Sequence, residues 1–263
     1  MRLILASASP RRAELLRSAG YDFEIHAVNI DERSKSGEPP AEYVERLARE
    51  KALRALGELS QKGPAKAGPH ADVASPLSGA IDELLSIGPA KAGPHALSDV
   101  ASGVSGVASG VPGVASGVSG VASGFSRTSE LVVLGADTAV VVGEAILGKP
   151  HDAEDAARML RRLSGRSHQV MTGVCLQTTH YSVSHVEISS VTFAPLTEDQ
   201  IAWYVASGEG LDKAGGYAIQ GLASRFIPRI EGSYSNVVGL PIAVVSDLLS
   251  RLTNLWSVLA CGE

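Results

Sequence analysis

The sequence predicts an α/β fold, and three observations support that prediction. Residues 2–20 read as a strand, a turn of small residues and a helix. Residues 131–142 form a valine-rich apolar run of the kind found in buried strands. Residues 152–193 place a capped amphipathic helix before two strand-like segments. With 263 residues, 44% of them hydrophobic, the chain can bury the core of one such domain.

The first expected element is a strand over 2–6, followed by a helix. Ser9 is a good N-cap for that helix, and Pro10 fits its first position. Arg11 and Arg12 stand in the first helical turn, where the helix dipole prefers acidic side chains. They are either solvated or needed by an anion at the helix start, and the pattern favours the anion.

A second strand is expected over 23–28, and Asp31 and Glu32 follow it in a loop. A helix is then expected from about 42 to 56, with an apolar stripe along one side. Lys51 falls inside that stripe. Its ammonium group therefore either reaches out to water or meets an anion, and the sequence leaves both alternatives open.

From 57 to 130 the composition changes to glycine, alanine, serine and valine, with two copies of Gly-Pro-Ala-Lys-Ala-Gly-Pro-His-Ala. Such repeats have few large side chains to bury, so ordering them is costly. The expectation is a flexible insertion with one short helical piece near 80–87. The chain is then one domain, 1–263, with its core in 1–56 and 131–263.

Asp137 follows the apolar run 131–134 and a Gly-Ala pair. It is therefore expected at or just past the carboxyl end of a strand, the edge where open α/β sheets bind ligands. A second run over 139–142, a turn and Lys149 complete a compact β unit with one carboxylate and one lysine at opposite ends. On the local pattern alone, an aspartate that caps a turn is an equal alternative.

The remaining elements follow in a regular order. A helix is expected over 152–164, then strands over 169–176 and 185–193 that pair antiparallel. A helix over 197–206 and a closing helix over 240–252 complete the core.

Between those last two helices, an acid and Lys213 precede a double glycine, where backbone can approach a ligand closely. Tyr217 and Ile219 are expected on one face of a strand, with Gln220 on the other. The Gln220 amide can donate to and accept from the edge of a base. An ordinary hairpin turn is the alternative.

Charge and cysteine usage exclude several classes. A net charge of −5 gives no general basic surface for duplex nucleic acid. Cys175 and Cys261 lie far apart, so neither a disulfide framework nor a zinc site is expected, and a reducing cytoplasm is the expected location. The N-terminal apolar run is too short for a signal peptide, and no run approaches the roughly 18 apolar residues of a membrane span.

Taken together, these motifs resemble the Maf-like nucleoside triphosphate pyrophosphatases. The matching stretches occur in the family's order: Ser7-Ala-Ser-Pro-Arg-Arg12, Glu45-Arg-Leu-Ala-Arg-Glu-Lys51-Ala52, Gly135-Ala-Asp-Thr138, Ile146-Leu-Gly-Lys-Pro150, Leu163-Ser-Gly165, Leu211-Asp-Lys-Ala-Gly215, Ile219-Gln-Gly221 and Gly232-Ser-Tyr-Ser-Asn236. Two departures stand out: the segment 57–130 replaces a short loop, and Gly210 replaces a proline.

The resemblance implies a mixed, twisted sheet with flanking helices, similar to the inosine triphosphate pyrophosphatase fold, in a protein that is often a homodimer. It also implies that a nucleoside triphosphate is hydrolysed to its monophosphate and pyrophosphate with Mg²⁺ or Mn²⁺. No Walker A loop is present, so phosphoryl transfer of that class is unsupported.

The resemblance implies a role for each matching residue. Asp137 matches the catalytic acid, which either activates water or holds the cation. The residues that match positions for base preference in the dTTP/UTP branch are Arg11, Thr138 and Gln220. Those expected around the phosphates are Ser7, Arg12, Lys51, Lys149 and Lys213. The expected metal ligands are Glu32 and Asp137.

Two alternatives to a dTTP/UTP pyrophosphatase remain. One is the family branch that acts on 7-methyl-GTP, against which Thr138 argues. The other is a regulator of cell division that binds nucleotide without turnover.

Overall fold

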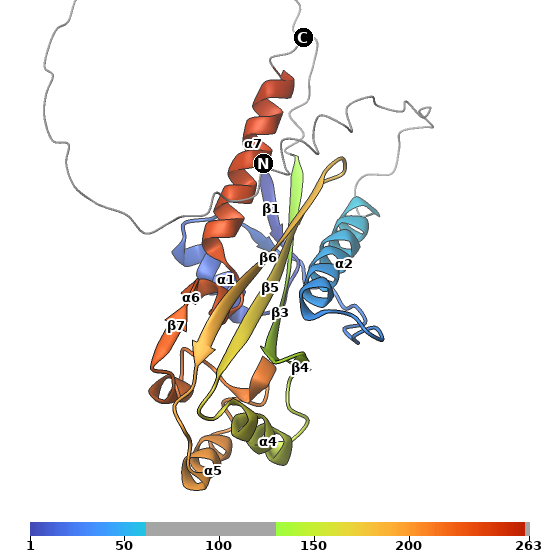
Figure 1. Cartoon of the computed structure of the whole chain (residues 1–263). Helices are drawn as coiled ribbons and strands as arrows, with labels where there is room; N and C mark the ends of the chain where they lie inside the picture. Colours follow the sequence, from blue (N-terminus) through green and yellow to red (C-terminus); the bar gives the residue numbers. More distant parts are fainter. Residues whose placement is uncertain (62–129, 261–263) are drawn as a thin grey trace, which may run out of the picture. The chain divides into compact units, whose positions relative to one another are not determined.

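The computed structural model describes residues 1–61 and 130–260, and the statements below concern those residues (Figure 1). Residues 62–129 and 261–263 lie outside the described ranges. The repeats, the helical piece expected at 80–87 and Cys261 therefore lie outside them too.

The described strands form one mixed sheet in the order β2-β1-β3-β5-β6-β7, and β4 pairs with β3 as a hairpin. β1 runs parallel to both β2 and β3, whereas the β3–β5, β5–β6 and β6–β7 pairs are antiparallel. The mixed, twisted sheet is thus confirmed. The strands are β1 Arg2–Leu5, β2 Glu24–Ile25, β3 Leu131–Val142, β4 Ala145–Leu147, β5 Ser167–Gln177, β6 Ser182–Thr192 and β7 Arg229–Glu231.

Helices cover both faces of this sheet, as Figure 1 shows. One face packs against α2 alone, and the opposite face packs against α1, α6 and α7. The helices are α1 Pro10–Ser18, α2 Pro40–Gln61, α4 Ala153–Leu163, α5 Glu198–Ala206, α6 Tyr234–Val238 and α7 Ile242–Ala260, with short 3₁₀ turns η1 Ala214–Gly216 and η2 Leu222–Phe226.

Four expectations about local structure are wrong in detail. The strand expected over 23–28 shrinks to two residues, and the helix expected to end near 56 continues to Gln61. The residues from Tyr217 to Ile219 form no strand; they lie in the loop between η1 and η2. Asp137 does not end a strand, since the Gly-Ala pair before it continues β3 without a break.

Two glycines explain how closely α2 lies on the sheet. A Cβ at Gly135 on β3 would overlap the carbonyl oxygen of Ala48, and a Cβ at Gly173 on β5 would overlap that of Val44. The backbone of α2 therefore rests directly on β3 and β5. This close approach brings the next turn of α2, with Lys51, to Asp137.

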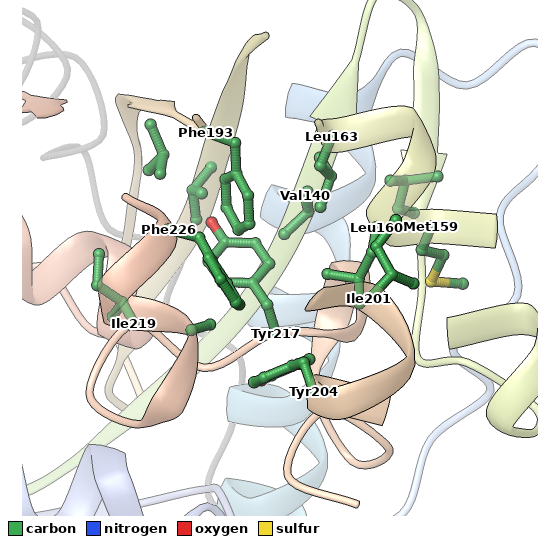
Figure 2. Close-up of a cluster of buried hydrophobic side chains, with 14 of the residues drawn as sticks. Val140, Met159, Leu160, Leu163, Phe193, Ile201, Tyr204, Tyr217, Ile219 and Phe226 are labelled. Atoms are coloured by element: carbon green, nitrogen blue, oxygen red, sulfur yellow. The ribbon is translucent and has the colours of Figure 1, made fainter. Parts of the chain in front are cut away.

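A second structural region lies at the far end of the sheet, where α4, α5 and the 3₁₀ turns meet the strands. Figure 2 shows its buried side chains, with the ring of Tyr217 near those of Phe193 and Phe226. The ring centroids of Phe193 and Tyr217 are 5.0 Å apart in an edge-to-face arrangement. This cluster anchors the loop that follows η1, and it determines which residues of that loop point outward.

Among the helices in the described ranges, none combines the length and the apolar character that crossing a bilayer requires.

Candidate functional site

A buried lysine between two carboxylates forms the centre of the site. Lys51 Nζ lies 2.7 Å from Asp137 Oδ1 and 2.7 Å from Glu32 Oε1. The side chains of Lys51 and Asp137 are 10% and 11% exposed, whereas that of Glu32 is 53% exposed. The site therefore opens toward solvent on the Glu32 side.

This geometry decides between the two alternatives for Lys51. Its ammonium group binds anions instead of reaching out to water, and those anions are two carboxylates of the protein itself. Burial raises the pKa of Glu32, but the hydrogen bond and charge of Lys51, with the charges of Lys149 and Arg12, outweigh it and lower that pKa overall. Within the described residues, Asp137 Oδ1 accepts a hydrogen bond from Lys51 and Oδ2 has no hydrogen-bond partner.

The position of Asp137 relative to β1 retains part of the expected geometry. β1 ends at Leu5, which pairs with Leu134, so Asp137 lies three residues past the carboxyl end of its parallel neighbour. The turn from β1 into α1 leaves the edge of β3 uncovered there. Asp137 thus lies within β3 but just past the carboxyl end of β1, at the edge of the sheet where ligands bind in open α/β folds.

Arg12 fills this uncovered edge. Its Nη1 donates to the carbonyl oxygen of Ala136 at 2.8 Å and to Ser7 Oγ at 3.1 Å, and its Nε donates to the carbonyl oxygen of Gly239 at 2.8 Å. Its Nη2 donates to Thr138 Oγ1 at 3.0 Å. Arg12 is 9% exposed, so the solvated alternative is wrong for it. Burial lowers the pKa of Arg12, against the opposing effect of the Asp137 and Glu32 charges.

Thr138 lies on the opposite face of β3 from Asp137, as strand alternation requires. Its Oγ1 is 2.9 Å from Thr172 Oγ1, and Thr172 donates to the carbonyl oxygen of Asn236 at 3.2 Å. Thr138 therefore holds the guanidinium group of Arg12. We infer that its predicted influence on base preference would act through Arg12.

Sequence reasoning assigned no role to Thr172 or Asn236, although Asn236 belongs to a matching motif. The side-chain amide of Asn236 is buried and donates to the carbonyl oxygen of Val170 at 3.0 Å and to Ser189 Oγ at 2.9 Å. The sequence signal for Asn236 is its position as the polar residue that ends the Ser-Tyr-Ser-Asn run before the closing helix. These residues fix α6 and, through it, the carbonyl oxygen of Gly239.

A further missed residue is Tyr43, one turn into α2. Its hydroxyl donates to the carbonyl oxygen of Glu32 at 2.9 Å. Burial raises the pKa of Tyr43 to about 12, and the charges of Asp137 and Glu32 add to the rise. Tyr43 thus holds the loop that brings Glu32 to Lys51.

Arg11 and Lys213 belong to a second charged group beside the site. Burial lowers the pKa of Arg11, while the charges of Asp212 and Glu209 oppose that change. Lys213 Nζ forms an ion pair with Asp212. Gln220 is exposed, and its side chain makes no hydrogen bond to the residues that the structure describes.

Lys149 is exposed, and its charge acts on Glu32. The amide of Gly215 donates to the carbonyl oxygen of Gly148 at 2.9 Å, which joins the segments that carry Lys149 and Lys213. The structure thus brings together Lys51, Asp137 and Glu32, with Lys149 beside them. It brings Arg12, Ser7 and Thr138 into a separate hydrogen-bonded group, while no hydrogen bond or ion pair joins Arg11 or Gln220 to either group within the described residues.

The carboxylate pair has the donor chemistry for a hard divalent cation, which prefers oxygen ligands. No cluster of three or more His, Cys, Asp or Glu arranged for a metal ion occurs within 1–61 and 130–260. Two carboxylates fit Mg²⁺ nonetheless, because this ion usually takes one or two of them and completes its shell with water and substrate phosphates. The residues present therefore fit a cation that binds together with a phosphorylated substrate.

Comparison with known proteins gives one consistent result. A family model described as Maf-like protein matches residues 2–75 and 108–252. A protein of Anaeromyxobacter sp. (strain Fw109-5) named dTTP/UTP pyrophosphatase is 39% identical over 255 residues, covering 95% of this chain and 89% of its own length. Proteins with the same name from Shigella sonnei (strain Ss046) and Vibrio cholerae are each 38% identical, covering 96% and 95% of this chain and 94% and 97% of their own.

Proposed function

The chain belongs to the Maf-like protein family, and from this premise we propose that it hydrolyses dTTP and UTP to the nucleoside monophosphate and pyrophosphate. The observation that carries the proposal is the buried Asp137–Lys51–Glu32 group at the carboxyl edge of β1. Relatives named dTTP/UTP pyrophosphatase support the choice of substrate.

Asp137 is the reactive carboxylate in this proposal. Lys51 holds Oδ1 in place at 2.7 Å, so Oδ2 is oriented and has no partner among the described residues. Oδ2 can therefore accept a proton from a water molecule that attacks the α-phosphorus. Because Lys51 is itself held by Glu32, the position of Asp137 does not depend on bound substrate.

The charge of the substrate gives the basic residues their role. A triphosphate brings about four negative charges, and pyrophosphate leaves with most of them. Lys149 and Lys213, with one remaining N–H of Arg12, can donate to phosphate oxygens. The hydroxyl of Ser7 accepts from Arg12, so Ser7 orients that guanidinium group and keeps its own O–H to donate to a phosphate oxygen.

In the alternative in which Asp137 holds the cation instead of activating water, Glu32 and Asp137 would bind Mg²⁺ or Mn²⁺ together. When bound, such a cation neutralises phosphate oxygens and orients the scissile anhydride. Titration of the metal-free protein with Mn²⁺, followed by electron paramagnetic resonance, tests this. Parent and Glu32→Gln proteins should differ at least about tenfold in Mn²⁺ affinity, and equal affinities would exclude Glu32 as a ligand.

A triphosphate panel with Mg²⁺, followed by chromatography of the products, tests the activity itself. We expect dTMP and UMP with pyrophosphate, formed faster than from purine triphosphates. Release of UDP and orthophosphate would contradict the pyrophosphatase mechanism. Faster turnover of 7-methyl-GTP would move the protein to the other branch, and binding of dTTP without turnover would favour the regulator.

A homodimer remains a prediction that light scattering can test. The cytoplasm remains the proposed location, and Cys175, which is buried and carries a free thiol, is consistent with it.

A further inference from the structure

Glu209, just past the end of α5, is in contact with the segment that carries Gln220. Its Oε1 accepts a hydrogen bond from the backbone amide of Leu222 at 2.9 Å. Its carboxylate also lies against Gly221, where an added Cβ would overlap Oε1. The absence of a side chain at Gly221 thus provides the space that this carboxylate occupies.

Tyr204, on α5, holds the other end of the same segment. Its hydroxyl accepts from the amide of Ala218 at 3.1 Å, and its side chain is almost fully buried. Figure 2 shows Tyr204 in the same buried cluster as Tyr217 and Ile219. Between these two anchors, Gln220 is the exposed residue that can reach a ligand.

The Glu209 carboxylate has an energetic cost that its contacts only partly offset. Its Oε2 is buried and has no well-formed hydrogen bond in the described part of the chain, although the hydroxyl of Tyr204, whose pKa is raised by burial and by Glu209, lies beside this carboxylate. Burying an unpaired polar oxygen costs free energy, so such an atom calls for an explanation. The charge of Glu209 also acts on Arg11. Glu209 therefore contacts the Gln220 segment and acts through its charge on Arg11, the two places where the sequence predicts base recognition.

We propose that Glu209 is a positioning residue for nucleotide recognition. By holding the Leu222 amide, its carboxylate fixes residues 218–222 and so places the Gln220 side chain at the base. Glu209 touches no reacting atom in this proposal, so its loss should weaken binding and leave the chemical step in place. The inference rests on the proposed pyrimidine nucleotide substrate.

Four variants test the proposal. Glu209→Ala removes the acceptor, and Glu209→Gln keeps an oxygen for the Leu222 amide. Gly221→Ala leaves Glu209 intact but displaces its carboxylate, and Gly221, with φ −116° and ψ −147°, lies outside the left-handed region that favours glycine. The fourth variant combines Glu209→Ala with Gly221→Ala. Glu198→Ala, at the exposed start of α5, is the matched control.

Three measurements apply to each variant: steady-state kinetics with dTTP and Mg²⁺, the Kd of dTTP in EDTA by calorimetry, and amide exchange at Leu222. For Glu209→Ala and Gly221→Ala we expect KM and Kd to rise about tenfold, kcat to change less than about threefold, and exchange at Leu222 to accelerate about tenfold. The double variant should lose no more than either single variant. Glu209→Gln and the control should stay within about threefold of the parent.

The outcomes separate this inference from the proposed function. A parent protein that releases no pyrophosphate refutes the function, while exchange and Kd still report on Glu209. If amide exchange at Leu222 is unchanged in Glu209→Ala, Glu209 does not hold residues 218–222, and the proposal is overturned. Faster exchange with unchanged Kd and KM overturns its role in recognition. If KM and Kd rise as much in Glu209→Gln as in Glu209→Ala, nucleotide recognition depends on the charge of Glu209 that acts on Arg11. The proposal that its hydrogen bond positions Gln220 is then wrong.

Discussion

Replacing Asp137 with asparagine should separate the catalytic contribution of its carboxylate from its structural contribution. Asparagine keeps an oxygen at the position of Oδ1, so Lys51 Nζ can still donate to it across the present 2.7 Å. The hydrogen bond keeps its charged ammonium donor but loses the charge of its acceptor, so the free energy of unfolding should fall by only about 1–2 kcal/mol. Lys51 also keeps its ion pair with Glu32, which limits the loss.

Turnover should fall far more than stability. A proton acceptor in the transition state contributes ~10²-fold or more, and an amide cannot accept the proton. We expect pyrophosphate release from dTTP to fall at least ~10²-fold, with an unchanged far-UV circular dichroism spectrum and a slightly lower urea midpoint. Glu58→Gln is the control, because Glu58 lies on α2 in ion pairs with His26 and Arg54, away from Asp137. Turnover by Asp137→Asn within about threefold of the parent would refute a direct catalytic role.

Three further outcomes follow from the same geometry. Lys51→Met should lower the free energy of unfolding by about 3 kcal/mol in urea denaturation, because it leaves Asp137 buried without a partner; a variant as stable as the parent would show that Asp137 is well solvated. Gly135→Ala should lower the free energy of unfolding by about 2 kcal/mol or more and reduce turnover, because its Cβ would push α2 and Lys51 away from β3; Gly57→Ala, on α2 with nothing within 4 Å of an added Cβ, is the control that should do neither. Burial lowers the pKa of His168 from 6.5 to about 4, so the unfolded chain takes up this proton first as the pH falls. Stability should therefore drop by roughly 3 kcal/mol between about pH 6.5 and pH 4, and His168→Leu should lack that part of the drop.

Much of the fold could be predicted because local signals agree with tertiary structure in most elements. Asp152 and Thr197 accept backbone hydrogen bonds at the starts of α4 and α5, as their N-cap positions predict. The continuation of β3 through Gly135 could not be predicted, since glycine suggests a break in a strand. The absence of a side chain at Gly135 lets the backbone of α2 approach β3, although α2 lies eighty-odd residues earlier in the chain.

The residue types of the site could be predicted, but their pairings could not. Lys51 stands out in an apolar stripe, yet the stripe does not show which anion it meets. The position of Arg12 at a helix start suggests an external anion, whereas its acceptors are neutral oxygens of the protein. Such pairings depend on which segments the sheet brings together, and neither composition nor spacing contains that information.

The alternation of β3 gives these pairings a common origin. Asp137 faces α2 and Thr138 faces α6, so two adjacent residues fix two separate cationic side chains, Lys51 on one face and Arg12 at the edge. A shift of β3 by one residue against β5 would exchange the two faces and place the carboxylate against Thr172. The register of β3 is therefore part of the site. It is maintained by the apolar residues of β3 that pack on both faces of the sheet and by Gly173, which admits α2 opposite Asp137.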